Sequence, residues 1–277
     1  MRTHLLIIDP QNDFCDLPAA SLPPQTQPAL PVPGAHADMQ RLAQLLHSSG
    51  NAFAAISITL DSHHRIDIAH PGFWQDAAGH NPPPFTQISL SDLQQGRWRP
   101  RQPQQAEWVA RYLRQLDAQG RYQLMIWPVH CQIGTWGQAI HSDLLHACND
   151  WEDRHARSIQ LIHKGAHPLT EHYSALCAEV PVEDAPETGL NHALLQALAQ
   201  AEHLIVAGEA GSHCVKASVE HLLQYAPQLA PRLTLLRDAI SAVAGFEAQY
   251  AEFLQRCAAQ GVRIATCDSL RASLAAA

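Results

Sequence analysis

Cys214 has the sequence surroundings of a nucleophile. It lies in the segment Val206-Ala-Gly-Glu-Ala-Gly-Ser-His-Cys-Val-Lys-Ala-Ser218, in which an apolar run ends in small residues and a helix is predicted to begin at the cysteine. Unpaired N–H groups and the positive end of the helix dipole favour the thiolate, which is the form that attacks carbonyl carbons. A half-buried structural cysteine is the alternative interpretation, so the decision between them depends on other residues of the chain.

A carboxylate and an amine follow two other predicted strands. Asp9 closes the apolar run that starts at His4, and Lys164 follows the run from Ser158 to His163. Taken singly, an aspartate before a proline also suits a turn, and a loop lysine is most often solvated. Because the carboxyl ends of parallel strands meet at one edge of a sheet, both side chains are expected near the candidate thiol.

These three residues together have the chemistry of amide cleavage. Asp9 would take the thiol proton, Cys214 would attack the carbonyl carbon to give a thioester, and water would hydrolyse that thioester. Lys164 would keep Asp9 ionised and favour the charged state of the pair. The backbone N–H groups of Ala210 and Cys214, in the Gly-rich turn, would hold the oxyanion.

A metal-binding pattern follows two further predicted strands. Asp61 and His63 come directly after the run 52–60 and offer a carboxylate oxygen and an imidazole nitrogen, as in Zn²⁺, Fe²⁺ and Mn²⁺ sites. Residues i and i+2 of an extended segment face the same side, although such pairs also arise by chance. His130 follows the run 124–127. If these strands are neighbours, His130 completes a three-ligand set with open positions for water or substrate.

The remaining elements alternate between strands and helices. Apolar runs at 203–207, 233–236 and 262–266 predict strands, and helical spacing of apolar residues predicts helices at 35–48, 106–119, 191–201, 213–225 and 245–260. This alternation predicts an α/β fold of three layers, with a doubly wound, mostly parallel sheet of about six strands. No linker or repeat divides the sequence, so residues 1–277 are interpreted as one domain.

The stretch from Pro71 to Gln123 interrupts the alternation. It is rich in proline and tryptophan and, at about fifty residues, it is too short for a core of its own. We interpret it as an insertion that covers the pocket as a lid or forms an oligomer contact. Exposed side chains of Trp74, Phe85 and Trp98 would suit either role.

Composition narrows the class of function. The net charge of −8 argues against nucleic acid and anionic membranes as main partners. The seven cysteines include no CxxC pair, which is typical of a reduced chain in a reducing compartment. No apolar run approaches the length of a membrane span. The expectation is a cytoplasmic enzyme with a small-molecule amide substrate, assembled as a homo-oligomer.

Five motifs follow one another along the chain: Ile-Ile-Asp9-Pro-Gln-Asn-Asp-Phe14, Asp61-Ser-His63, Trp127-Pro-Val-His130-Cys-Gln-Ile-Gly-Thr-Trp-Gly137, His163-Lys164-Gly and Gly208-Glu-Ala-Gly-Ser-His-Cys214-Val. In their order and spacing they resemble the motifs of the isochorismatase-like cysteine hydrolases, and within them the nicotinamidases. The resemblance implies an isochorismatase-like fold and the hydrolysis of nicotinamide, or a related small amide, to the acid and ammonia.

The resemblance also implies roles for individual residues. The catalytic triad falls on Asp9, Lys164 and Cys214, the oxyanion hole on Ala210 and Cys214 after a cis peptide at Glu209–Ala210, the metal ligands on Asp61, His63 and His130, and the substrate-binding positions on Phe14, Trp127 and His213. The cofactor implied is a divalent metal, with zinc expected and iron or manganese as alternatives. It would orient the substrate through the pyridine nitrogen.

The chain departs from the nicotinamidase pattern at several points. Ser62 stands where an aromatic residue is usual, His70 lies slightly off the position of a fourth metal-site histidine, and the insertion replaces a short connection. These departures leave two alternatives open. One is a metal-free hydrolase of the same superfamily that acts on carbamoyl compounds or ureides. The other is a non-catalytic binding protein on the same fold.

Overall fold

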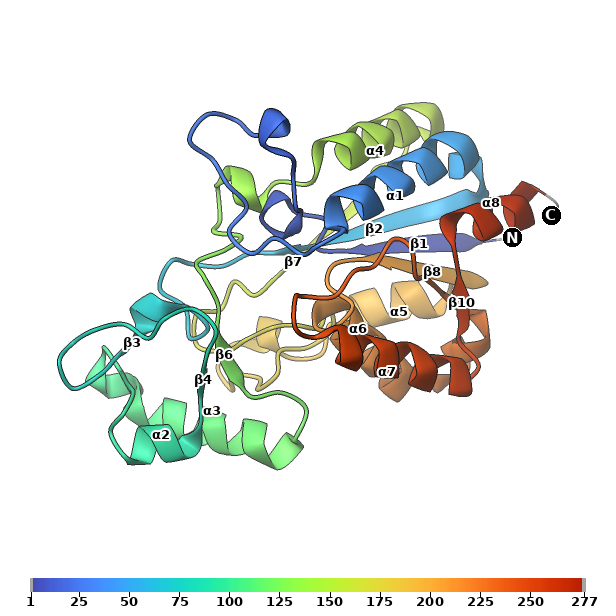
Figure 1. Ribbon diagram of the computed structural model, residues 1–277. Coiled ribbons are helices and arrows are strands. Elements are labelled where there is room, and N and C mark those ends of the chain that lie inside the picture. The colour runs from blue at the N-terminus through green and yellow to red at the C-terminus, as the bar shows by residue number, and fades with distance from the viewer. Residues whose placement is uncertain (1, 276–277) are drawn as a thin grey trace.

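A parallel β-sheet forms the centre of the molecule (Figure 1). The computed structural model describes residues 2–275, and its sheet has six parallel strands in the order β10-β9-β8-β1-β2-β7. The strands are β1 (Thr3–Ile8), β2 (Phe53–Asp61), β7 (Gln160–Lys164), β8 (His203–Gly208), β9 (Leu233–Leu236) and β10 (Arg263–Ala265). The predicted fold class is confirmed.

Helices cover both faces of this sheet and give the three predicted layers. One face carries α1 (Ala35–Ser49), α4 (Ser142–His155) and α8 (Cys267–Ala275), and the other carries α5 (His192–Ala199), α6 (Cys214–Tyr225) and α7 (Glu247–Ala259) (Figure 1). Crossover helices of this kind join parallel strands and bury the sheet on both sides. The carboxyl ends of the strands therefore remain the accessible edge for a site.

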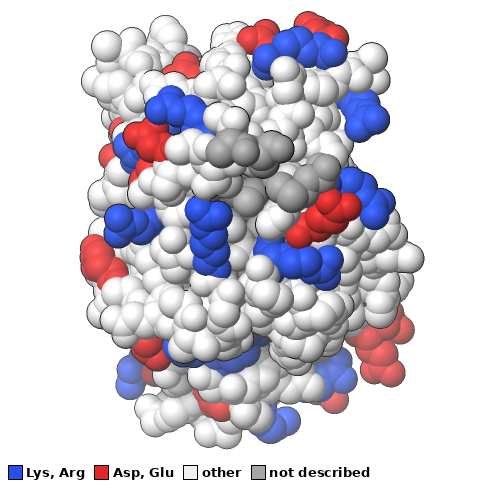
Figure 2. Space-filling view, turned by 90° about the vertical axis from the view of Figure 1, so that its right-hand side faces the viewer, with Lys and Arg blue, Asp and Glu red and all other residues white. Residues whose placement is uncertain are grey.

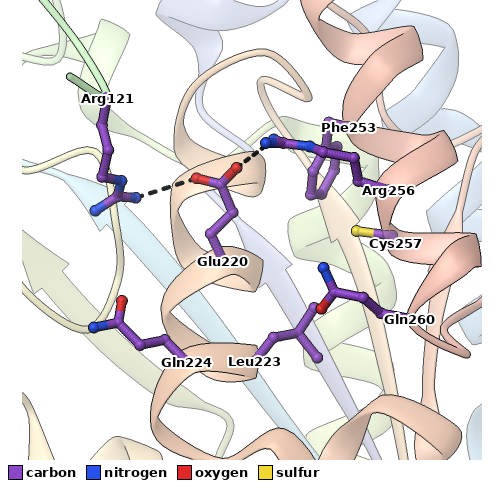
Figure 3. Close-up of a pocket in the computed structure, with 8 residues that line it drawn as sticks. All are labelled: Arg121, Glu220, Leu223, Gln224, Phe253, Arg256, Cys257 and Gln260. Atoms are coloured by element: carbon purple, nitrogen blue, oxygen red, sulfur yellow. Dashed lines mark hydrogen bonds and ion pairs between the residues drawn. The ribbon is translucent and has the colours of Figure 1, made fainter. Parts of the chain in front are cut away.

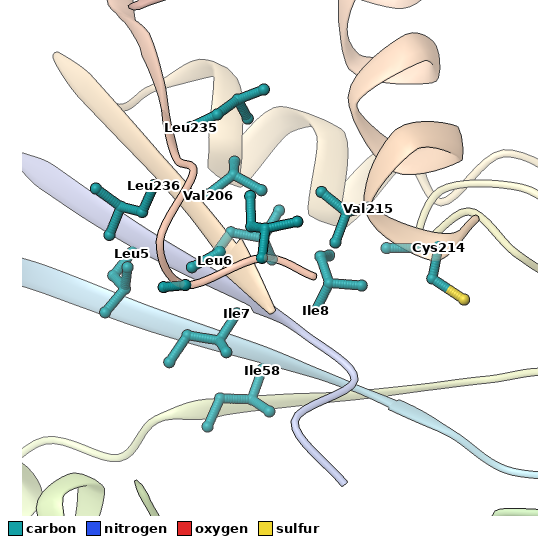
Figure 4. Packing of buried hydrophobic residues seen from close by; sticks show 14 of the residues in the cluster. Leu5, Leu6, Ile7, Ile8, Ile58, Val206, Cys214, Val215, Leu235 and Leu236 are labelled. Carbon is teal, nitrogen blue, oxygen red and sulfur yellow. The ribbon is translucent and has the colours of Figure 1, made fainter. Parts of the chain in front are cut away.

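The first strand shows why the sequence reads as a continuous apolar run. All six residues of β1 are buried, because side chains on both faces of the strand meet helices. Figure 4 shows Leu5 to Ile8 packed among Ile58 of β2, Val206 of β8 and Val215 of α6. In the same view the sulfur of Cys214 points away from these apolar side chains, toward the carboxyl edge of the sheet.

The segment 71–123 forms a lobe beside the sheet (Figure 1). Its elements are β3 (Trp74–Gln75), β4 (Thr86–Ile88), α2 (Leu90–Gln94), β5 (Arg99–Pro100) and α3 (Ala106–Gln119), followed by β6 (Leu124–Ile126). β3 pairs with β5 and β4 pairs with β6, both antiparallel. The predicted strand at 124–127 therefore exists but lies outside the central sheet. The condition that this strand lies beside β2 in the sheet, under which His130 was expected to complete the ligand set, is not met.

The lobe also has an apolar cluster of its own, contrary to the expectation from its length. Phe73, Trp74, Tyr112 and the leucines of α3 pack there against β6 and against Ile68 and Val180 from the adjoining loops. The prediction of an exposed Trp74 was wrong, since its ring is at the centre of this cluster. Phe85 is exposed as predicted, and Trp98 is partly buried. Borrowing apolar residues from outside the segment lets so short a stretch form a core.

On the face that carries the chain termini, lysines and arginines are interspersed with aspartates and glutamates (Figure 2). Within residues 2–275, no helix combines the length and the hydropathy that crossing a bilayer requires.

Candidate active site

Lys164 joins the candidate catalytic residues at the carboxyl edge of the sheet. Its Nζ atom lies 2.9 Å from Asp9 Oδ2, 3.0 Å from Asp61 Oδ1 and 3.6 Å from Cys214 Sγ, and it donates a 3.0 Å hydrogen bond to the carbonyl of His172. All of these side chains are buried. Asp9 directly follows β1, Lys164 ends β7 and Cys214 begins α6 after β8. β1 lies beside β8, and β2 separates it from β7, so the three groups meet across the carboxyl edge of the sheet.

Burial and charge set the resting protonation of this group. Burial opposes the charge of Lys164, but the carboxylates of Asp61 and Asp9 raise its pKa well above the usual range and keep it an ammonium. Burial raises the pKa of Cys214 well above its usual range, and Lys164 opposes this only in part. The resting sulfur is therefore a thiol, although its place at the start of α6 favoured a thiolate. Burial also raises the pKa of Asp9, against the effect of Lys164, which makes it a stronger base.

The turn before Cys214 has the form of an oxyanion hole. The peptide Glu209–Ala210 is cis, as the resemblance implied. Within the described residues, neither the Ala210 amide nor the Cys214 amide donates a backbone hydrogen bond, and both residues line the pocket. Gly208 precedes them with φ +110°, and a Cβ there would lie 2.0 Å from the carbonyl oxygen of Ile8. Only glycine allows β8 to approach β1 this closely.

A second group of side chains lies beside the first and shares Asp61 with it. Asp61 Oδ2 lies 3.1 Å from His63 Nε2 and 3.5 Å from His130 Nε2. One oxygen and two imidazole nitrogens thus converge, with ligand atoms all within 4.8 Å of one another, as a metal site requires. His70 stands at the side of this group, with its Nε2 atom 3.3 Å from His130 Nδ1.

Partners on the far side of each ring orient the histidines. His63 Nδ1 lies 3.2 Å from Asp67 Oδ2, and His130 Nδ1 lies 2.9 Å from the carbonyl of Pro128. These contacts place the Nδ1 proton away from the site and leave Nε2 free to bind a cation. Although burial opposes it, the carboxylates of Asp61 and Asp67 raise the pKa of His63 well above its usual range. The site therefore attracts positive charge at this point.

His130 reaches this group by a different route from the predicted one. Because β6 lies in the lobe, its chain does not run beside β2 within the sheet. Instead the backbone of His63 donates to Cys131 and accepts from Ile133, both at 3.0 Å, which forms an isolated parallel bridge beyond the end of β2. The three predicted side chains thus lie together, and loops rather than adjacent strands bring His130 to the other two.

Two residues of the first loop hold both halves of the site in place. Gln11 donates from Nε2 to the carbonyl of Asp61 at 2.8 Å and accepts from the amide of Asp61 at 2.7 Å. Asp13 accepts a 2.6 Å hydrogen bond from the amide of Cys131, next to His130. Both side chains are buried, so these bonds are shielded from competition with water.

A pocket opens between the two groups and has aromatic walls. Phe14, Trp127, Tyr173 and His213 line it, while Cys214 lies at its polar end with Asp61, His130, Ala210 and Glu171. Trp127 donates from Nε1 to the Tyr173 hydroxyl at 3.1 Å, which fixes the indole plane. Burial lowers the pKa of His213 to about 3, so its ring is neutral. The three predicted substrate-binding residues therefore line one pocket, which suits a flat ring.

No protein-family model and no curated relative matches this sequence, so the similarity found is structural. The nicotinamidase/pyrazinamidase of Acinetobacter baumannii superposes with a TM-score of 0.63 at 19% identity, over 97% of this chain and 98% of that one. The pyrazinamidase of Pyrococcus horikoshii, in complex with zinc, gives 0.55 at 18% identity, over 96% and 99%. An isochorismatase-like hydrolase of Alkaliphilus metalliredigens gives 0.54 at 12% identity, over 99% of both chains.

The fold is that of the nicotinamidases. It is shared with the isochorismatase-like hydrolase, as the five motifs led us to expect of the fold. At these identities the comparison establishes the fold, and the assignment of roles depends on the geometry above.

Several residues that shape this site carried no predicted role. Asp67 supports His63, Gln11 and Asp13 hold the loops, and Tyr173 and Glu171 line the pocket. Gln11 and Asp13 stand inside a motif, and Asp67 follows His63 by four residues, which are the only sequence signals for them. Glu171 is buried, and its Oε2 atom has no hydrogen-bond partner among the described residues.

A second hollow on the surface has no part in this site. It lies between α6 and α7, where Glu220 pairs with Arg121 at 3.3 Å and with Arg256 at 2.6 Å (Figure 3). Both arginines pair with this one carboxylate, and the hollow contains none of the predicted site residues.

Proposed function

We propose that this protein hydrolyses a small amide, nicotinamide or a related heteroaromatic carboxamide, with Cys214 as the nucleophile. One observation carries the proposal. The buried ammonium of Lys164 lies 2.9 Å from the Asp9 carboxylate and 3.6 Å from the Cys214 thiol. These are the groups that amide cleavage through a thioester needs. The nicotinamidase fold and the flat aromatic pocket support an aromatic amide as the substrate.

In the acylation step, Asp9 accepts the Cys214 proton as the sulfur bonds to the carbonyl carbon. The displaced electron pair moves to the carbonyl oxygen, where the amides of Ala210 and Cys214 stabilise it. When the tetrahedral intermediate collapses, the C–N bond breaks and Asp9 returns the proton to the leaving nitrogen. Ammonia leaves, and the acyl group stays on sulfur.

In the hydrolysis step, water attacks the thioester carbon and gives one proton to Asp9. The C–S bond breaks, the carboxylic acid is released, and the sulfur takes the proton back from Asp9. Lys164 stays an ammonium throughout and stabilises each anionic form in turn, first the thiolate and then the Asp9 carboxylate.

The histidine group would hold a divalent metal next to this chemistry. Asp61, His63 and His130 present one oxygen and two nitrogens, and Gly165 leaves the room, since a Cβ there would lie 2.8 Å from Asp61 Oδ1. When bound, the metal would orient and polarise the substrate ring. The zinc complex of the Pyrococcus pyrazinamidase supports zinc, and Fe²⁺ or Mn²⁺ suits the same donors.

The test is an ammonia-release assay over nicotinamide, pyrazinamide and ureides, with metal content measured on the same sample. We expect release from the pyridine and pyrazine amides, about one metal ion per chain, and loss of turnover in Cys214→Ala. The double variant His63→Ala/His130→Ala should lose the metal. Turnover of ureides by a metal-free wild type would instead favour the second hydrolase class. Failure of the wild type to turn over any amide would leave only the binding-protein alternative.

A further inference from the structure

The lobe brings one aromatic side chain to the outer side of the pocket wall. β4 and β6 are paired so that Thr86 lies opposite Ile126, and the amide of Phe85 donates to the carbonyl of Ile126 at 2.5 Å. Phe85 and Trp127 are the residues that directly flank this pair, just outside the two strands. Their ring centroids are 6.0 Å apart with an interplanar angle of 85°, an edge-to-face contact.

Phe85 is exposed although the lobe has an apolar core that could bury it. Its exposed fraction is 55%, whereas Phe73, Trp74 and Tyr112 of the same lobe are fully buried. Trp127, by contrast, is 3% exposed and lines the pocket with its neighbour His213. The phenyl ring therefore contacts an indole of the pocket wall on one side and solvent on the other.

The local chain keeps Phe85 in this place. Three prolines, Pro82 to Pro84, precede it and restrict the backbone, and its own φ is +66°, a region that phenylalanine rarely adopts. A glycine or an asparagine would suit this φ better, so the backbone alone does not account for a phenylalanine. Observed outliers of this kind are most often found at functional sites.

We propose that Phe85 is a specificity residue, which binds an apolar substituent on the ring of an aromatic carboxamide whose amide group lies at Cys214. This inference rests on the proposed function and names the substrate class within it. The amide and ring would occupy the pocket between Phe14 and Trp127, and the substituent would pass Trp127 and contact the phenyl ring. The lobe would thereby select larger amides than plain nicotinamide.

The experiment compares nicotinamide with nicotinamides that carry methyl, propyl or phenyl groups at ring carbon 5 or 6. In the wild type, KM should fall as the substituent becomes larger, either among the amides substituted at carbon 5 or among those substituted at carbon 6. In Phe85→Ala, kcat/KM for the best substituted amide should drop about tenfold more than for nicotinamide, the size expected for one apolar contact. The loss should appear in KM rather than in kcat, because the contact is remote from the reacting carbon.

Two further variants separate the ring from the backbone. Phe85→Gly relieves the positive φ and also removes the ring, so it should lose the same preference as Phe85→Ala, while Phe85→Trp should keep it. Leu145→Ala removes another exposed apolar side chain, on α4, and is the matched control. It should leave kcat/KM unchanged for both nicotinamide and the substituted amide. Thermal unfolding of each variant checks that the fold is intact.

Two outcomes would overturn the inference. In one, the wild type rejects every substituted amide. In the other, Phe85→Ala lowers kcat/KM for all amides equally, which would mean that the residue only supports Trp127. If the wild type releases ammonia from no amide at all, the proposed function fails, and the inference is then decided by calorimetric binding of the corresponding acids. Equal affinity of the wild type and Phe85→Ala for substituted acids would overturn it in that case too.

Discussion

The two groups that share Asp61 are built in different ways. Asp9, Lys164 and Cys214 stand at the ends of elements within the central layers, where sheet register and helix packing fix the backbone. His63 and His130 stand on loops beyond the sheet, joined by an isolated bridge and by side-chain bonds from other loops. The first group is positioned by the fold itself, and the second by a set of individual hydrogen bonds.

The difference predicts how each group responds to substitution. A residue of the first group can change without moving its neighbours, because the strands continue to hold them. In the second group, removing a supporting side chain should disturb the ligands although the fold remains. One motif links the two, since the stretch that begins with Asp9 also supplies Gln11 and Asp13 to the histidine loops.

The largest effect is expected from Asp9→Asn. The amide cannot accept the thiol proton, so kcat should fall by about 10³-fold, within the usual range for loss of a general base. Alkylation of Cys214 by iodoacetamide should speed up instead, because the Asp9 carboxylate raises the pKa of the Cys214 thiol and its loss favours the thiolate. Metal content should remain at the wild-type level, because Asp9 contacts no histidine of the second group.

Asp143→Asn, at an exposed position on α4, is the matched control and should leave all three readouts at the wild-type values. If Asp9→Asn loses both the bound metal and its turnover, the two groups of side chains are not held independently of each other.

The same difference explains how far the sequence could predict the molecule. Asp9, Lys164 and Cys214 follow long apolar runs, and parallel strands bring such ends together, so their convergence could be predicted without coordinates. The strand at 124–126 could not be assigned to a sheet in the same way. A run of three apolar residues has the same pattern in a central sheet and in a lobe. The pattern indicates that the residues are buried, but not which strand they pair with.

The supporting residues show a second limit. Nothing in the type or spacing of Gln11 distinguishes a side chain that binds the backbone of Asp61 from a polar residue in a turn. Trp74 was predicted to be exposed because a short segment offers little core, yet the lobe completes its core with Ile68 and Val180 from elsewhere in the chain. Contacts between distant segments decide such cases, and a local pattern does not contain them.

Asp67→Asn should produce a smaller and different effect from Asp9→Asn. It removes the carboxylate that orients His63, and loss of such a partner typically lowers metal affinity by about 10–100-fold. Competition with a chromophoric chelator measures this affinity, with Asp143→Asn again as control. The alkylation rate of Cys214 should not change. Unaltered metal affinity would show that His63 is held by its backbone bridge alone.

The smallest change is expected from Gln11→Ala, which tests whether the link between the groups is structural. The substitution leaves the buried amide of Asp61 without its acceptor, which typically costs about 1–3 kcal/mol of unfolding free energy. Gln138→Ala is the matched control, because that glutamine is partly exposed and bonds to the neighbouring Ser62 hydroxyl at 2.9 Å. Denaturant unfolding should show the larger loss of unfolding free energy in Gln11→Ala, and this variant should also bind the metal more weakly.

The position of the base is held separately. The amide of Asp9 donates to the carbonyl of Thr59 at 3.1 Å, so alkylation of Cys214 should continue at the wild-type rate in Gln11→Ala. A changed alkylation rate in Gln11→Ala would mean that the loop, and not the strand end, positions the base.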